Sequence, residues 1–191
     1  MAQAPASPIT EERFKKGKTF QEYLDSGIRN RELFEQNYNG LEVSDAQAAA
    51  LKAAKAKKGL DHMAVIGEDW CPDVYRGLPV LARLAEAAGI EFKSLPRDQN
   101  LDIMNAYLNK GEFQSVPCAL FYTGNMDLIL SWHERPEKAN QEIHQMRDIV
   151  GSRTREEAAD DLLKFRRGPV WAGWRGATID ELISLLEAKV G

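Results

Sequence analysis

The distribution of hydrophobic residues predicts a strand followed by a helix near the middle of the chain. Met63-Ala64-Val65-Ile66 is short, apolar and unbroken, which is typical of a strand buried on both faces, although the pattern alone does not exclude a helix. After Trp70-Cys71-Pro72-Asp73, apolar residues recur at spacings of three and four, the period of an amphipathic helix. These residues are Val74, Leu78, Leu81, Leu84 and Ala85. The sequence therefore predicts a tight turn and then a helix that begins at or near Cys71.

Apolar runs further along the chain predict the rest of a sheet. Residues 90–95 alternate with period two, which predicts a strand, and residues 101–108 carry an apolar stripe with helical spacing. The runs 118–122 and 128–132 are joined by a turn containing Gly124-Asn125, which predicts an antiparallel hairpin. The order strand, helix, strand, helix, hairpin, helix predicts a mixed central sheet with helices on both faces.

The remaining residues predict helical extensions around this core. Ser44 can cap a helix over Asp45–Lys58, which is rich in Ala and Lys. Further helices are predicted after Pro136, after a capping-box spacing at Thr154, and after a second one at Thr178. The predicted segments of the chain are a flexible leader at 1–9, an N-terminal helical extension at 10–59, the core at 60–135, and C-terminal helices at 136–191 that complete the same domain.

Residues 166–176 contain three glycines together with Trp171 and Trp174. We predict an irregular loop here, because such a glycine content disfavours regular structure. The two tryptophans either plug the edge of the core, which is the interpretation that we favour, or cover an active site or contact a partner.

Composition and charge narrow the class of protein. The chain has 191 residues, 43% of them hydrophobic and 28% charged, which is typical of one soluble globular domain. Its net charge of −4 offers no broad attraction to nucleic acid or to an anionic membrane, so neither partner is expected. No apolar segment approaches the ~20 residues that a membrane helix needs, and no signal peptide is visible.

The polar residues do not predict a cofactor or a metal. His62, His133 and His144 lack the spacing of a zinc site, and no phosphate-binding glycine motif is present. The two cysteines show no disulfide-rich pattern and fit a reducing compartment, from which we expect a cytoplasmic location.

Cys71 is the main candidate for chemistry. The N-terminus of a helix carries unpaired N–H groups and partial positive charge, which favour a thiolate, the nucleophilic form of cysteine. Glu68, Asp69 and Asp73 oppose that effect, because nearby carboxylates disfavour a second negative charge. The sequence does not decide which influence is larger.

These features together resemble the thioredoxin superfamily. In that family a W-C-x-x-C motif opens a helix that is kinked by a proline eight residues after the first cysteine, and Pro79 stands at that offset from Cys71. The family also has a cis-proline facing the cysteines, and Pro117 after Val116 matches it in sequence distance. The resemblance covers about residues 60–135 and implies a thioredoxin-like three-layer α/β/α fold, with a mixed central sheet and a cis-proline at Pro117.

The chain departs from the family pattern at two positions. Val74 replaces the second, resolving cysteine, so a dithiol cycle within the motif is impossible. Val65 replaces the buried acid that many thioredoxins carry in the preceding strand. Cys118 is the only other cysteine, and it either resolves adducts of Cys71 or, as we favour, is a small buried apolar side chain.

Two functions of different class follow from the resemblance. The first is thiol-disulfide exchange or mixed-disulfide formation through Cys71, with Trp70 shielding the sulfur and Pro117 shaping a groove. Its partner would be a protein or a small-molecule thiol or disulfide, with glutathione as one candidate and Arg76, Arg97 or Lys93 available to meet its carboxylates. The second is a non-catalytic binding module that uses the cis-proline groove and the loop of Trp171 and Trp174. A one-cysteine peroxidase is disfavoured, because no peroxiredoxin-like Thr/Ser and Arg pattern surrounds Cys71.

Overall fold

The apolar runs predicted as strands pair into one sheet. The computed structural model describes residues 8–188, and within that range the sheet has four strands in the order β2-β1-β3-β4. They are β1 (Leu60–Gly67), β2 (Glu91–Pro96), β3 (Cys118–Thr123) and β4 (Leu128–His133). β1 pairs with β2 in parallel and with β3 antiparallel, and β3 pairs antiparallel with β4 as the hairpin pattern predicts.

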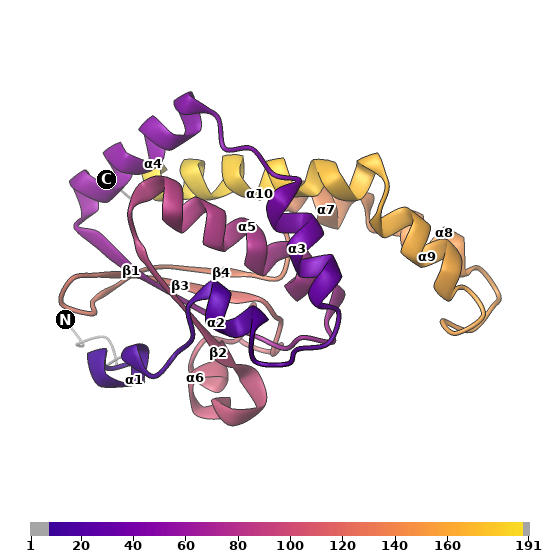
Figure 1. Cartoon of the computed structure of the whole chain (residues 1–191), viewed down its shortest axis with the longest axis horizontal. Coiled ribbons are helices and arrows are strands. Elements are labelled where there is room, and N and C mark those ends of the chain that lie inside the picture. The colour runs from indigo at the N-terminus through magenta and orange to yellow at the C-terminus, as the bar shows by residue number, and fades with distance from the viewer. Residues whose placement is uncertain (1–7, 189–191) are drawn as a thin grey trace.

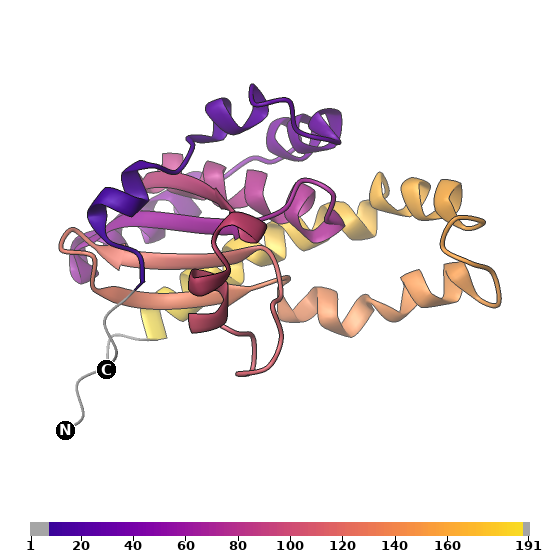
Figure 2. The same ribbon diagram turned by 90° about the horizontal axis from the view of Figure 1, so that it is seen from below.

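Helices cover both faces of this sheet, as Figures 1 and 2 show. α5 packs against β1 and β2, α10 lies along α4 and α5, and α6 lies on the opposite face. The helices are α1 (Glu11–Lys15), α2 (Phe20–Leu24), α3 (Arg31–Asn39), α4 (Asp45–Lys58), α5 (Pro72–Ala88), α6 (Leu101–Ala106), α7 (Glu137–Glu142), α8 (His144–Val150), α9 (Ala159–Arg166) and α10 (Pro169–Ala188), with a short 3-10 helix at Arg97–Gln99. The predicted mixed sheet between layers of helices is confirmed.

The ends of the central helices follow the capping signals of the sequence. The Ser44 side chain accepts a hydrogen bond from the N–H of Gln47 and completes a capping box at the start of α4. Gly59 and Gly89 are the C-cap residues that follow α4 and α5, and both are left-handed, with φ of 63° and 67°. The helix predicted over residues 101–108 is shorter than expected, because α6 ends at Ala106.

The predicted loop at 166–176 is wrong, because most of these residues form the first turns of α10. Trp171 and Trp174 are buried at 1% and 0% exposure, three residues apart on one helix face. Burial of two large aromatic rings outweighs the low helix propensity of the glycines. Thr178 lies inside the same helix, where its hydroxyl donates to the Trp174 carbonyl at 2.9 Å, so it does not cap a new helix.

Helices α8 and α9 project from the body of the molecule, as Figures 1 and 2 show. We call residues 144–166 the α8–α9 arm. The single helix predicted after Pro136 is divided at Ile143 into α7 and α8, and α9 packs against α8 and against α10. The capping box at Thr154 does form hydrogen bonds, but α9 begins only at Ala159.

The predicted leader at residues 1–9 falls mainly outside the described range. Its last residue is part of the folded structure, because Ile9 is buried at 1% exposure. The carbonyl of Pro8 accepts a hydrogen bond from Arg13 at 3.3 Å. The two described residues of the predicted leader, Pro8 and Ile9, thus contact the rest of the chain, and the boundary at residue 9 stays a prediction.

Candidate functional site

Cys71 occupies the N-cap position of α5, immediately before Pro72 at the first helical position. Its carbonyl accepts the first helical hydrogen bonds, from the N–H groups of Val74 at 3.0 Å and Tyr75 at 3.1 Å. Its own N–H donates to the Glu68 carbonyl at 3.2 Å and closes the turn after β1. The cysteine is half-buried at the end of the central strand, as the strand-turn-helix pattern predicts.

Burial has the largest effect on the pKa of the Cys71 thiol. Burial raises the pKa of its thiol above the ordinary value, and the charges of Asp73 and Glu134 raise it further. The backbone N–H groups of Val74 and Asp73 lower the pKa of Cys71, as expected at a helix start, but burial is the largest influence. Cys71 is therefore mainly a thiol at neutral pH in the unliganded protein.

Pro117 lies directly beside this thiol. The peptide bond between Val116 and Pro117 is cis, and the Val116 carbonyl oxygen lies 3.8 Å from the Cys71 sulfur. Pro117 also packs on the first turns of α5, since a Cβ added at Gly77 would lie 3.0 Å from its ring. The structure thus brings Cys71 and Pro117 together, whereas they are far apart in the sequence.

Cys118 is the first residue of β3 and is completely buried. It pairs across the sheet with Ile66 and His133. Burial raises the pKa of its thiol far above that of a free cysteine, and both cysteines are free in the structure. These features are those of a buried apolar side chain, and a resolving role for Cys118 stays a prediction.

Trp70 is the exposed residue of the motif, with 46% of its surface accessible. The guanidinium of Arg97 lies 5.3 Å from the centre of its ring and also donates to Asp98 at 2.7 Å. The guanidinium of Arg97 therefore already contacts both Trp70 and Asp98. The suggestion that Arg76 meets a ligand is wrong, because this side chain has no exposed surface.

Arg76 instead holds the first turns of α5 to two other elements. Its guanidinium donates to Asp73 at 3.1 Å, to the Glu134 carbonyl at 3.1 Å, and to the Thr178 hydroxyl at 3.4 Å. Arg135 approaches the second oxygen of Asp73 at 2.9 Å. The carboxylate of Asp73 thus lies between two guanidinium groups, one residue beyond Pro72.

The tryptophans of α10 complete the surroundings of this arginine. The guanidinium of Arg76 lies 5.4 Å from the Trp171 ring and 5.9 Å from the Trp174 ring. Burial lowers the pKa of Arg76, and the charge of Asp73 opposes that shift. Trp171 and Trp174 therefore pack against a buried ion pair, and the prediction that they lie in a loop is wrong because both belong to α10.

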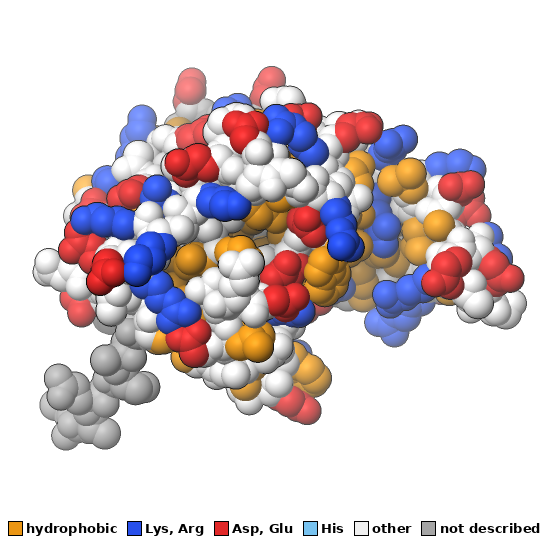
Figure 3. Space-filling model, turned by 60° about the horizontal axis from the view of Figure 1, so that its bottom comes forward, with side chains coloured by type: hydrophobic (Ala, Val, Ile, Leu, Met, Phe, Trp, Pro, Cys, Tyr) orange, Lys and Arg blue, Asp and Glu red, His pale blue; other side chains and the backbone are white. Residues whose placement is uncertain are grey.

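A hollow with a volume of about 720 Å³ lies next to Cys71, between α5 and the α8–α9 arm. Apolar and basic side chains gather where the arm meets the body of the molecule, as Figure 3 shows. The lining residues are Trp70, Cys71, Pro72, Asp73, Arg135, Ile143, Met146, Arg147, Val150, Gly151, Arg155, Leu162, Arg166 and Trp171. Four of them are arginines and one is a carboxylate, so the hollow is locally positive in a chain with a net charge of −4.

The sequence did not reveal this hollow. Ile143, Met146 and Val150 are half-buried in its wall, and Ile143 and Met146 also pack against the core. The sequence feature that could have indicated the hollow is the concentration of arginines after Arg135. That pattern alone is equally typical of a solvated helix face. Only the return of the chain through the arm brings Arg166 close to Arg135.

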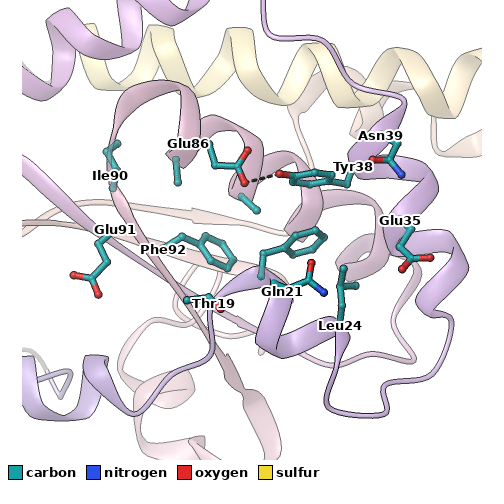
Figure 4. Close-up of a pocket in the computed structure, with 13 residues that line it drawn as sticks. Thr19, Gln21, Leu24, Glu35, Tyr38, Asn39, Glu86, Ile90, Glu91 and Phe92 are labelled. Carbon is teal, nitrogen blue, oxygen red and sulfur yellow. Dashed lines mark hydrogen bonds between the residues drawn. The ribbon is translucent and has the colours of Figure 1, made fainter.

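A second hollow, of about 500 Å³, lies between α2, α3, α5 and β2, as Figure 4 shows. It shares no lining residue with the hollow at Cys71. Its wall contains Glu35, Glu86 and Glu91, and the hydroxyl of Tyr38 donates to Glu86. This hollow has no cysteine, so we place the candidate site at Cys71.

Within residues 8–188, no three His, Cys, Asp or Glu side chains are grouped so that they could hold a metal ion. In the same range no helix has the length and hydropathy needed to cross a bilayer.

Comparison with known proteins identifies the family. The model of the family described as thioredoxin matches residues 17–147, and the chain therefore belongs to the thioredoxin family. The match begins in the N-terminal helices, well before the W-C motif. No curated protein matches the chain.

Two solved structures share the fold. A protein of unknown function from Pseudomonas aeruginosa is 15% identical, with a TM-score of 0.62 over 92% of this chain and 95% of that one. An HIV epitope-scaffold is 17% identical, with a TM-score of 0.63 over 93% of this chain and 96% of that one. At this identity the likeness concerns the fold alone.

Proposed function

We propose that this thioredoxin-like protein forms mixed disulfides through the single thiol of Cys71 and holds them without resolving them itself. The observation that carries the proposal is a half-buried cysteine at the start of α5, beside Pro117, with Val74 where a resolving thiol would stand. Val74 is completely buried, so the position that a second cysteine would occupy is filled by packing.

The chemistry is one exchange step. The thiol of Cys71 loses its proton to water, and the thiolate attacks one sulfur of a disulfide R–S–S–R′. A bond forms between Cys71 and the sulfur of R, the S–S bond of the substrate breaks, and R′ leaves as a thiolate that takes up a proton. No electrons are gained or lost overall, because one disulfide replaces another.

The raised pKa of Cys71 favours the persistence of this adduct. A thiol with a high pKa is a poor leaving group, so an external thiol displaces Cys71 slowly from its mixed disulfide. Cys118 has no exposed surface and a pKa raised by burial, which disfavours its attack on the adduct. Reversal then depends on a thiol supplied from outside the chain.

The competing hypothesis is a binding module without exchange. Part of the basis for this hypothesis is removed, because Trp171 and Trp174 are buried in α10 and do not form a loop. The remaining part of the hypothesis is a groove at Pro117, which would bind a partner equally well without a thiol at residue 71.

The test is the mass of the intact chain after incubation with a small disulfide. The expected result is one adduct per chain, present in the Cys118→Ala variant and absent from the Cys71→Ser variant. Absence of any adduct from the wild-type chain, under conditions where an unfolded sample reacts, would refute the proposal and support the binding module.

A further inference from the structure

We propose that the hollow beside Cys71 selects small disulfides that carry carboxylate or phosphate groups on an apolar body. This inference rests on the proposed exchange at Cys71 and names the class of substrate. Its basis is the combination of positive charge, apolar surface and a sulfur atom in one hollow of about 720 Å³, a volume typical of sites for small molecules.

Part of the positive charge of the hollow is not neutralised by ion pairs within the protein. Asp73 is the one carboxylate in its wall, and that group is already shared by Arg76 and Arg135. Arg147 and Arg155 are exposed and form no ion pair with any residue of the described chain. Two guanidinium groups therefore remain available for an anion, and a guanidinium binds carboxylates and phosphates through paired hydrogen bonds.

Arg166 adds a third guanidinium to the wall of the hollow, and this one is engaged by the protein. It is half-buried, its Nε has no hydrogen-bond partner, and its guanidinium forms a hydrogen bond with Tyr75. Burial raises the pKa of Tyr75, and the charge of Arg166 opposes that shift. Arg166 comes from α9, whereas Arg147 comes from α8. The wall of the hollow thus carries guanidinium groups from both helices of the α8–α9 arm, and the two without an ion pair are Arg147 of α8 and Arg155 of the segment between the helices.

The floor of the hollow is apolar. Ile143, Met146 and Val150 come from the α7–α8 segment, and Leu162 and Trp171 face them from α9 and α10. An ion alone would leave this surface in contact with water, whereas an apolar body that carries the ion would cover it. A small molecule fits this site better than a protein partner, because the lining residues form a hollow of about 720 Å³ rather than a flat face.

Two disulfide reagents of similar size test the inference. 5,5′-Dithiobis(2-nitrobenzoate) carries a carboxylate on each aromatic ring, and 2,2′-dithiodipyridine is neutral. The rate of mixed-disulfide formation at Cys71 is measured with each reagent in the Cys118→Ala background. The ratio of the two rates is divided by the same ratio for the urea-unfolded chain, which removes the intrinsic difference between the reagents.

We expect the corrected ratio to favour the anionic reagent and to fall as salt is raised, because salt screens exposed charges. The double variant Arg147→Gln with Arg155→Gln should lower that ratio roughly fivefold, the scale of two exposed ion pairs. The matched control is Lys52→Gln with Lys57→Gln, which removes the same charge from exposed positions of α4 and should leave the ratio unchanged.

Competing anions distinguish the two kinds of acidic group. Citrate and pyrophosphate are added at matched ionic strength, and the stronger inhibitor of the anionic reagent identifies carboxylate or phosphate as the preferred group. A corrected ratio near one that neither variant changes, or inhibition by neither anion, would overturn this inference and leave the proposed function intact. Failure of Cys71 to react with either reagent would refute the proposed function itself.

Discussion

Replacing Arg76 by Met tests the buried arrangement that supports the thiol. Arg76 has no exposed surface, and it links α5 to the end of β4 and to α10 through Asp73, Glu134 and Thr178. Methionine keeps an unbranched apolar stem and removes the guanidinium that lies near the two tryptophan rings. The variant therefore separates the charge and hydrogen bonds of Arg76 from its packing.

The expected loss of stability follows from the contacts that disappear. The two hydrogen bonds at 3.1 Å are charge-assisted, each contributing about 1.5–3 kcal/mol, whereas the contact at 3.4 Å contributes little. Asp73 keeps its contact with Arg135 at 2.9 Å, so its charge does not become unpaired. Removal of the buried guanidinium also removes its desolvation cost, and the net loss is about 3 kcal/mol.

Urea unfolding followed by circular dichroism measures this difference. A loss of about 3 kcal/mol corresponds to a fall in Tm of roughly 6–12 °C for a chain of this size. Arg83→Met is the matched control, because Arg83 lies on the same helix, is 37% exposed, and pairs with Glu86 at 3.3 Å. It should cost less than about 1 kcal/mol. Equal small losses in both variants would refute the structural role that we assign to Arg76.

Two further predictions concern the acidity of Cys71. Because burial raises its pKa, the rate of alkylation by iodoacetamide should keep rising with pH beyond the midpoint of an ordinary free thiol at about 8.5, and a midpoint below that value would contradict the account. Because the pKa of Cys71 is higher in the folded chain than in the unfolded chain, the protonated thiol stabilises the fold at pH values below the pKa of the unfolded chain. This contribution is lost as the pH rises through the pKa of the folded chain. Asp73→Asn should lower the pKa of Cys71 and speed its alkylation at neutral pH, because the charge of Asp73 raises that pKa. An unchanged or slower rate, with stability monitored in parallel, would show that Asp73 does not act through its charge.

Local patterns in the sequence were sufficient to predict β1, the start of α5 and the hairpin of β3 and β4. Each of these depends on residues close together in the chain, such as the apolar run 63–66 and the turn at Gly124. The position of Pro117 beside Cys71 came from the family resemblance, because no local pattern places residues that are so distant in sequence side by side.

The features that the sequence did not predict depend on tertiary packing. α10 forms across Gly173 and Gly176 because Trp171 and Trp174 are buried against α5, and local propensity does not report that burial. The raised pKa of Cys71 has the same origin, since desolvation depends on what surrounds the sulfur in three dimensions.

The most direct test of the central claim is the lifetime of a mixed disulfide on Cys71 in the presence and absence of a resolving thiol. Val74→Cys places a second thiol three residues along α5, on the same face of the helix. The account predicts that the wild-type chain keeps its adduct until external thiol is added, whereas the variant releases it and forms a disulfide between residues 71 and 74. Spontaneous release from the wild-type chain at the rate of the variant, with formation of a disulfide between Cys71 and Cys118, would contradict the account.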